Sequence, residues 1–148
     1  MENIEKGIAD NISIPSGFEL KRIDRNLDLN LYTNKDFLTN EISGFWGSLD
    51  RFFHKGVGYC TVSGDVIAGL GYTGYIAGDV YTIGIITNEQ FRRIGLAEAA
   101  VRAILKEYSA MGVRPYWDCM EENIASYSLA RKVGFKKRYE YSVYWFYF

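Results

Sequence analysis

The sequence has few of the residues that build cross-linked or metal-stabilised proteins: two cysteines, one histidine and two prolines among 148 residues. Cys60 and Cys119 are far apart and both lie in strand-like surroundings, which argues against a disulfide framework or a zinc cluster. No apolar run is long enough to span a bilayer, and the N-terminus lacks the basic-then-apolar pattern of a secretion signal. We therefore expect a cytoplasmic protein with no metal site and no membrane partner.

An excess of charge of one sign is missing as well. The 17 lysines and arginines nearly balance the 18 aspartates and glutamates, so the formal net charge is −1. Proteins that attract nucleic acid through their electrostatic field carry a positive excess, so we expect no nucleic-acid partner. The chain is instead rich in apolar side chains, at 48%, and this share excludes a disordered chain.

The length is sufficient for one hydrophobic core, and we expect a single domain over residues 1–148. The first part of the chain has weak patterns. A short strand is expected between Ile12 and Leu20, and helical pieces between Asn26 and Phe53. Gly44 and Gly47 disfavour one continuous helix there, because glycine in a helix interior costs about 1 kcal/mol relative to alanine.

The pattern becomes regular from Gly56 onward. Strands are predicted at Gly58–Val62, Val66–Tyr72 and Val80–Ile86, because β-branched and aromatic residues recur there between turn residues. A Ser-Gly-Asp turn joins the first two strands, and a glycine-containing loop over Thr73–Asp79 precedes the third. Such short connections predict an antiparallel meander.

Two helices and a short strand follow the meander. An apolar stripe predicts a long helix that starts at Leu96 and stops at Gly112. A short aromatic strand is expected at Pro115–Met120, and a second helix between Asn123, a good N-cap residue, and Gly134. The tail over Phe135–Phe148 should supply one or two closing strands, and an exposed aromatic face on it would favour a homodimer.

A basic, glycine-containing turn precedes the long helix. Its backbone N–H groups can point outward and, with the positive end of the helix dipole, bind a pyrophosphate. These are the N–H groups of Arg93, Ile94, Gly95, Leu96 and Ala97. Gly95 lets the backbone approach the ligand closely, and Arg92 and Arg93 would add charge-assisted contacts. The same residues also fit an ordinary helix start with a solvated basic edge.

The segment Arg92-Arg-Ile-Gly-Leu-Ala97 resembles the pyrophosphate loop of the GCN5-related N-acetyltransferase (GNAT) superfamily, Gln/Arg-x-x-Gly-x-Gly/Ala. A second block, at the required spacing, resembles the superfamily's terminal helix: Asn123-x-x-Ser126-x-x-Leu129-Ala130-x-Lys132-x-Gly134-Phe135. More narrowly, Pro115-Tyr-Trp-Asp-Cys119 and Gly56-Val-Gly-Tyr59 resemble the subfamily that includes the zwittermicin-resistance protein. The resemblance covers residues 56–148, the expected acetyl-CoA-binding core, whereas residues 1–55 match poorly. Members of that subfamily are often longer at the N-terminus, so this chain would correspond to their catalytic module.

The resemblance implies an α/β (α+β) fold of the GNAT type, a mixed central sheet with flanking helices. In this fold strands Val80–Ile86 and Pro115–Met120 would splay apart. The pantetheine arm of acetyl-CoA would lie in the gap and bond to the main chain at Ile85, Ile86 and Thr87. A backbone N–H of the first strand would stabilise the oxyanion. Asn123 and Ser126 would face the same gap and hold the pantetheine amides, and Asn123 would equally serve as a helix cap.

The catalytic side chains typical of the superfamily are incomplete. Related sequences carry carboxylates where this chain has Thr82 and Ile86, and frequently a general-acid tyrosine where it has Ala130. Glu89 and Ser126 are our catalytic candidates. Glu89 also fits a solvated loop residue, and Ser126 would either protonate a leaving thiolate or bind pantetheine.

The function implied by the resemblance is that of an acetyl-CoA-dependent N-acetyltransferase acting by direct transfer to a primary amine. The narrower resemblance favours an amine of a small molecule. The missing carboxylates and tyrosine favour an alternative, a catalytically weak or inactive coenzyme A-binding module for sensing or interaction. Glu41 is expected to approach the acceptor side from the N-terminal region. An acyl-enzyme on Cys119 is unsupported, because the one histidine, His54, lies in a distant segment.

Overall fold

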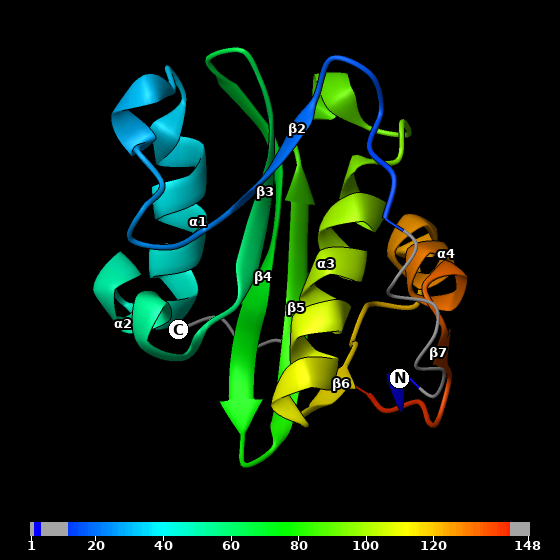
Figure 1. Ribbon diagram of the computed structural model, residues 1–148. Coiled ribbons are helices and arrows are strands. Elements are labelled where there is room, and N and C mark those ends of the chain that lie inside the picture. The colour runs from blue at the N-terminus through cyan, green and yellow to red at the C-terminus, as the bar shows by residue number, and fades with distance from the viewer. Residues whose placement is uncertain (1, 4–11, 143–148) are drawn as a thin grey trace, which may run out of the picture.

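A twisted sheet runs through the molecule with helices on both faces (Figure 1). The computed structural model describes residues 2–3 and 12–142, and within these the sheet has seven strands. The elements follow in the order β1 (Glu2–Asn3), β2 (Glu19–Arg22), η2 (Leu29–Leu31), α1 (Lys35–Trp46), α2 (Leu49–Lys55), β3 (Gly58–Ser63), β4 (Val66–Ala77), β5 (Val80–Thr87), η3 (Glu89–Phe91), α3 (Leu96–Met111), β6 (Arg114–Tyr116), α4 (Ile124–Lys132) and β7 (Phe135–Lys136). Both η elements are single 3-10 turns.

The strand order is β2-β3-β4-β5-β6-β1-β7. Strands β2 to β5 pair antiparallel, which confirms the predicted meander. Strand β6 runs parallel to β5, because α3 carries the chain back to the end of the sheet at which β5 begins. Strand β1, from the other end of the chain, lies between β6 and β7 and pairs antiparallel with both. The sheet is therefore mixed, as expected.

Strands β5 and β6 pair only over their first residues. Val80–Thr82 of β5 pairs with Arg114–Tyr116 of β6. Beyond this point β5 continues through residues 83–87, whereas β6 ends. In Figure 1 the chain leaves β6 beside the lower end of β5 and turns away toward α4. The two strands therefore splay apart, which is the gap that the resemblance implied.

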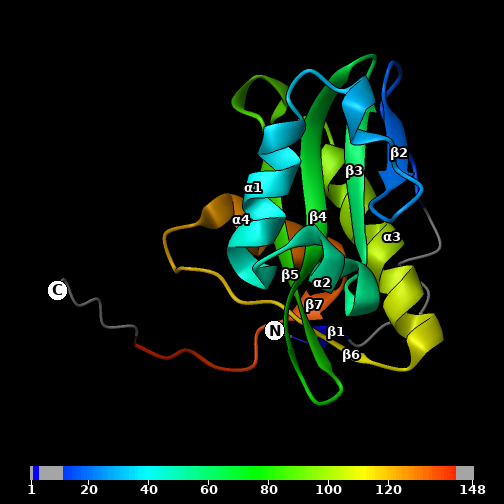
Figure 2. The same ribbon diagram turned by 90° about the vertical axis from the view of Figure 1, so that its left-hand side faces the viewer.

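Two hydrophobic clusters fill the space between the sheet and its two helix layers. Helices α1 and α2 lie on one face of the sheet and α3 and α4 on the other (Figures 1 and 2). The α3-side core includes Ile83, Ile104, Tyr108, Trp117 and Ala130. The α1-side core includes Leu38, Ile42, Phe52, Leu70 and Tyr72. Successive side chains of a strand point to opposite faces, so β5 contributes Ile83 and Ile85 to one core and Ile86 to the other.

The helix boundaries follow from local chemistry. Helix α3 ends at Gly112, whose φ of 73° is left-handed, and the predicted stop is confirmed. The side chain of Asn123 caps α4 by accepting a hydrogen bond from the Ser126 N–H at 3.1 Å. The helical pieces expected between Asn26 and Phe53 are η2, α1 and most of α2. Helix α1 continues through Gly44 and stops at Gly47.

The expected loop over Thr73–Asp79 is wrong, because β4 continues to Ala77. Its pairing with β5 shifts register between Thr73 and Ile76. The Thr82 hydroxyl occupies this irregularity: it accepts a hydrogen bond from the Tyr75 N–H at 2.6 Å and donates to the Tyr75 carbonyl at 3.3 Å. A side chain of β5 thus replaces missing ladder bonds, so the glycine-containing segment remains part of the strand.

Three other strands are shorter than expected. The strand predicted between Ile12 and Leu20 begins only at Glu19, as β2. The strand predicted at Pro115–Met120 ends at Tyr116, and the next residue, Trp117, is buried in the α3-side core. Of the closing strands predicted in the tail, the structure shows β7 alone up to residue 142, and residues 143–148 lie outside the described part.

Candidate active site

The loop before α3 has an unusual backbone. Gly95, the N-cap residue, has a φ of 90° and no side chain that could cap the helix. Arg93 has a φ of 68° and is the one non-glycine residue with positive φ among residues 2–3 and 12–142. An L-residue in the left-handed region costs roughly 1–2 kcal/mol, and such strain gathers at functional sites. The loop therefore holds Arg93 in a conformation that this residue type disfavours, whereas Gly95 adopts its positive φ without strain.

The strained loop leaves a row of backbone donors open. The first N–H groups of an α-helix have no partner within the helix. The first backbone bond of α3 runs from the Ala99 N–H to the Gly95 carbonyl at 3.3 Å, and no described residue accepts from the N–H groups of residues 93–97. Residues 92–95 are exposed. These donors and the positive end of the helix dipole form a site for an anion.

The charged side chains around this helix start have distinct partners. Arg92 folds back, and its Nε donates to the Thr87 carbonyl at 3.3 Å, which ties the loop to the end of β5. Glu98 contacts Arg102 of α3 at 3.0 Å and Lys132 of α4 at 2.9 Å. Burial alone would raise the pKa of Glu98, but the hydrogen bonds from Lys132 and Arg102 outweigh burial and hold that pKa below its ordinary value. Because these two cations neutralise Glu98, Arg92 and Arg93 leave the loop positive.

The free edge of β5 faces the gap between the splayed strands. On its other edge β5 pairs with β4, where Gly71 is opposite Ile85 and Gly69 opposite Thr87. The side chains of Ile85 and Ile86 pack into opposite cores. What β5 offers the gap is therefore its main chain, whose outward N–H and C=O groups beyond Thr82 pair with no strand in the described part of the chain.

The start of α4 carries Asn123 as its cap residue and places Ser126 against Trp117 of the α3-side core. The role of Asn123 as a helix cap is confirmed. The Ser126 hydroxyl accepts a hydrogen bond from the Trp117 indole N–H at 3.0 Å. Ser126 thereby anchors the residue at which the chain leaves β6, and its own O–H remains a donor.

The structure does not bring the two catalytic candidates together. Glu89 lies on η3, exposed, and no described contact joins it to Ser126. Ala130, at the position of the superfamily's tyrosine, is fully buried, and the ring of the neighbouring Tyr127 lies against Arg131 at 6.0 Å. Burial raises the pKa of the Cys60 thiol to about 12, so this cysteine is not a thiolate at neutral pH.

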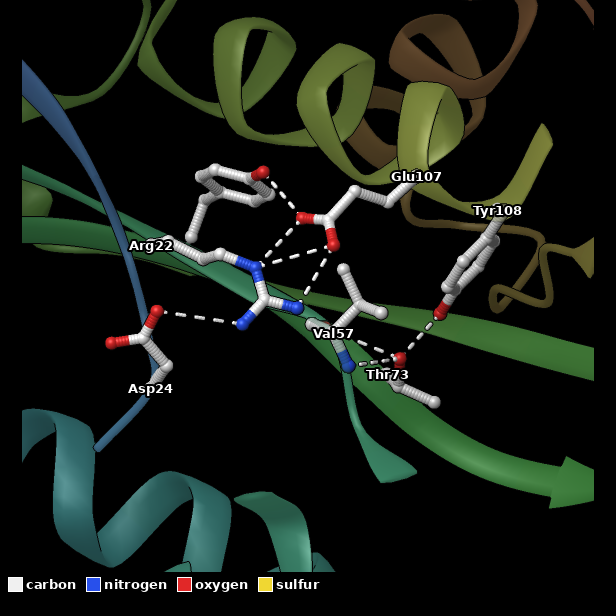
Figure 3. A network of polar contacts seen from close by, with 7 residues as sticks. Arg22, Asp24, Val57, Thr73, Glu107 and Tyr108 are labelled. Atoms are coloured by element: carbon white, nitrogen blue, oxygen red, sulfur yellow. Dashed lines mark hydrogen bonds and ion pairs between the residues drawn. The ribbon is translucent and has the colours of Figure 1, made fainter. Parts of the chain in front are cut away.

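Two polar contacts beside the gap were not predicted. On the α3 side, the Tyr108 hydroxyl donates to the Thr82 carbonyl at 3.1 Å. The same hydroxyl lies 2.6 Å from the Thr73 Oγ1 (Figure 3). On the α1 side, the Tyr72 hydroxyl donates to Glu41 Oε1 at 2.5 Å. The partners in the second contact are 31 residues apart in the chain. No local spacing reports such a pair, although Glu41 itself was expected to approach the acceptor side.

A model of the family described as GNAT acetyltransferase matches residues 5–144. The chain belongs to the GNAT acetyltransferase family. The uncapped helix start, the basic loop and the splayed strand pair are the features that the resemblance implied for this family.

Individual relatives agree with this assignment. The chain is 28% identical over 140 residues to an uncharacterized N-acetyltransferase, YdfB, of Bacillus subtilis (strain 168), covering 95% of this chain and 52% of that protein. The GCN5-related N-acetyltransferase-like protein from Streptococcus suis 89/1591 is similar in structure, with a TM-score of 0.72 and 23% identity over 90% of this chain and 53% of that one. The chain thus spans about half the length of both relatives.

A third relative is AAC(6')-Iy, an aminoglycoside N-acetyltransferase solved with the bisubstrate analog CoA-S-monomethyl-acetylneamine. Its TM-score is 0.65 at 15% identity, over 89% of this chain and 99% of that one. At this identity the likeness concerns the fold, and it confirms the mixed α/β architecture with flanking helices. Among the described helices, none combines the length and apolar character needed to cross a membrane.

Proposed function

We propose that this chain is an acetyl-CoA-dependent N-acetyltransferase domain that transfers an acetyl group directly to the primary amine of a small molecule. The observation that carries the proposal is the start of α3, which is uncapped and lies behind an exposed, basic and strained loop. The open N–H groups and the dipole of such a helix start favour a bound anion, and a pyrophosphate is an anion of this kind. Membership of the GNAT family supports the same ligand.

Each predicted binding residue has a place in this proposal. Arg92, Arg93 and the backbone N–H groups of Ile94, Gly95, Leu96 and Ala97 would hold the pyrophosphate. The main chain of Ile85, Ile86 and Thr87 would bind the pantetheine arm along the free edge of β5, with Asn123 and Ser126 reaching it from α4. When bound, acetyl-CoA supplies the acetyl group as a thioester. An N–H of β5 would stabilise the negative charge that develops on its carbonyl oxygen.

The catalytic candidates and the narrower assignments stay proposals. Ser126 would donate its free O–H to pantetheine or to the leaving thiolate, and Glu89 would act only if the acceptor reaches η3. A small-molecule amine follows from the resemblance to the zwittermicin-resistance subfamily. Structural relatives include enzymes for two classes of acceptor, small molecules and proteins: AAC(6')-Iy acts on an aminoglycoside and RimL on ribosomal protein L7/L12. The single domain over residues 1–148, the cytoplasmic location and the homodimer also remain predictions.

Thermal stabilisation by acetyl-CoA tests the ligand. A ligand at 100 times its Kd raises the free energy of unfolding by about 2.7 kcal/mol, which corresponds to a Tm increase of about 5–11 °C at this size. Gly95→Val should remove the increase. Gly78→Val is the matched control, because Gly78 also has positive φ and an open Cβ position but lies in the β4–β5 turn. Gly78→Val should lower the Tm of the ligand-free protein and keep the Tm increase caused by acetyl-CoA.

The outcomes separate the alternatives. If acetyl-CoA does not raise the Tm of the unmodified protein, the proposed function is wrong. If acetyl-CoA binds but no free thiol is released with any of a panel of primary amines, even at raised pH, the chain is a binding module and not an enzyme. Thiol release that depends on an amine supports direct transfer.

A further inference from the structure

The sheet face opposite α3 carries a carboxylate that has no cationic partner among residues 2–3 and 12–142. Glu41 of α1 is half-buried, and its one described contact is the hydrogen bond from Tyr72. The half-buried carboxylates Glu98 and Glu107 are each paired with an arginine. No lysine, arginine or histidine of the described residues lies within ion-pair distance of Glu41. A carboxylate that is partly removed from water and lacks a counter-charge is a place for a bound cation.

This carboxylate lies beside the segment of β5 that faces the gap. Tyr72 is opposite Gly84 in the β4–β5 ladder. Its ring lies over Gly84: a Cβ there would be 2.8 Å from the Tyr72 Cζ and 3.0 Å from its hydroxyl oxygen. Gly84 is two residues beyond Thr82, the last residue of β5 that pairs with β6. The Tyr72 hydroxyl and its partner Glu41 therefore stand where the strands begin to splay.

Glu41 lies on the face from which β5 itself supplies no carboxylate. Thr82, Gly84 and Ile86 alternate onto this face of β5. The Thr82 hydroxyl is engaged by the main chain of Tyr75, and Ile86 packs into the α1-side core. No side chain of β5 on this face can therefore accept a proton. Helix α1 places the Glu41 carboxylate over the same part of the sheet.

Exposed aromatic rings stand next to Glu41. Phe45, one helical turn further along α1, contacts the rings of Tyr72 and Tyr75 with centroids 5.5 and 5.3 Å apart. Phe45 is 42% exposed and Tyr75 is 64% exposed. Aromatic faces attract ammonium groups and pack against carbon chains. The rings and the carboxylate together suit an ammonium group on an apolar or aromatic stem.

We propose that Glu41 binds the ammonium group of the acceptor amine and takes its proton, and that Phe45 and Tyr75 contact the carbon stem. This rests on the proposed function. An N–H bond of the ammonium breaks and an O–H bond forms on Glu41. The nitrogen lone pair then forms the C–N bond as the C–S bond breaks, the electron pair leaves on sulfur, and the thiolate takes up the second proton that nitrogen loses. Tyr72 holds Glu41 Oε1, so Oε2 is the oxygen free for the amine.

Glu41→Gln tests the proposal, since it keeps an acceptor for Tyr72 and removes the charge. Asp36→Asn is the matched control: it removes a charge from an exposed position on the same helix. 2-Phenylethylamine is the probe amine, and 2-phenylethanol is its uncharged counterpart. NMR titration measures binding, thiol release measures turnover, and the Tm increase caused by acetyl-CoA reports the fold and the coenzyme site of each variant.

Glu41→Gln should weaken binding of 2-phenylethylamine about 10- to 100-fold and lower kcat/KM by about 100-fold or more. Raised pH should partly restore turnover, because more of the amine is then already neutral. Tyr72 is the titratable group of β4 that contacts Glu41, and burial followed by the hydrogen bond to Glu41 raises the pKa of Tyr72. Tyr72→Phe keeps the carboxylate and should cost less, about threefold to tenfold in KM. Asp36→Asn should change each quantity less than twofold.

Four results would overturn the assignment of Glu41: kcat/KM of Glu41→Gln within threefold of the unmodified protein, equal amine binding by both, equal binding of 2-phenylethanol and 2-phenylethylamine, or no binding of the amine by the unmodified protein. Each counts only against this inference as long as acetyl-CoA still raises the Tm. Loss of the Tm increase in the unmodified protein overturns the proposed function instead.

Discussion

The buried contact between α3 and the sheet at Tyr108 leads to a quantitative prediction for Tyr108→Phe. Tyr108, Thr73 and Val57 are all buried. The Val57 N–H donates to the Thr73 Oγ1 at 3.0 Å, and the Thr73 and Tyr108 hydroxyls are 2.6 Å apart. The Tyr108 hydroxyl donates to the Thr82 carbonyl at 3.1 Å. A chain of three bonds therefore runs from Val57, just before β3, to β5, and Figure 3 shows its part from Val57 through Thr73 to Tyr108.

Removal of the Tyr108 hydroxyl breaks two of these bonds but leaves only one polar group without a hydrogen-bond partner. The Thr73 hydroxyl can turn to the Val57 carbonyl, which lies 3.2 Å away, and the Thr82 carbonyl remains without its donor. A half-buried acceptor left without this donor and a small cavity give an expected cost of about 1–2 kcal/mol, or about 2–8 °C in Tm. Thr73→Val should cost more, about 2–3 kcal/mol, because it also leaves the buried Val57 N–H without an acceptor.

Chemical denaturation of the two single variants and the double variant measures these costs and their coupling. The double variant should be less destabilised than the sum of the two, because both substitutions break the same chain. The reasoning is refuted if Tyr108→Phe leaves the free energy of unfolding unchanged, if Thr73→Val is the milder substitution, or if the two costs add.

Three further predictions concern other parts of the fold. Gly84→Ala should destabilise the protein by about 1–3 kcal/mol, because the added Cβ would lie 2.8 Å from the Tyr72 ring. Gly44→Ala in α1 should stabilise the protein by about 0.5–1 kcal/mol, because no atom lies within 4 Å of the added Cβ. Thermal melts that rank the two variants the other way would contradict the packing described. Burial would raise the pKa of Glu107, but the hydrogen bonds from Arg22 and Tyr59 outweigh burial and lower that pKa. The stability that these bonds contribute is therefore present above the ordinary carboxyl pKa and is lost as pH falls through the lower pKa of the folded state. The difference in stability between the unmodified protein and Glu107→Gln, of the order of 1 kcal/mol after solvent screening, should therefore be full at neutral pH and shrink in acid, and a difference that is constant with pH would speak against the ion pair. Asn123→Ala should lower the free energy of unfolding by about 1 kcal/mol through loss of the α4 cap, measured by denaturation, with Asn123→Ser retaining most of it.

Much of the fold could be predicted because its signals are local. Alternating β-branched residues located β3, β4 and β5, and the apolar stripe that Gly112 terminates located α3. The Asn123 cap is a contact with a residue three positions away, so a short motif reports it fully. The errors fell where a local signal was overruled by a distant one, as at Thr73–Ala77, which remains in β4 because Thr82 of the next strand completes its hydrogen bonds.

The coenzyme-binding part and the catalytic part of the candidate site also differ in whether local sequence or distant contacts define them. The loop over residues 92–97 is a continuous segment, so its glycine and arginines could be identified together. The Glu41–Tyr72 contact joins α1 to β4, and neither residue stands in a motif. A carboxylate missing from β5 can be noticed in the sequence, but where another element places one can be learned only from the packing of α1 on the sheet.

The sequence by itself determined the meander, the two helices that follow it, the basic glycine turn between β5 and α3, and the family these features indicate. The tertiary structure decided that β1 enters the sheet between β6 and β7, that β5 and β6 part after Thr82, and that Glu41 meets the hydroxyl of the Tyr72 ring that lies over Gly84. The physical reason is that periodicity and caps reflect forces within a few residues of chain. They show which face of an element is buried but not which distant side chain covers it.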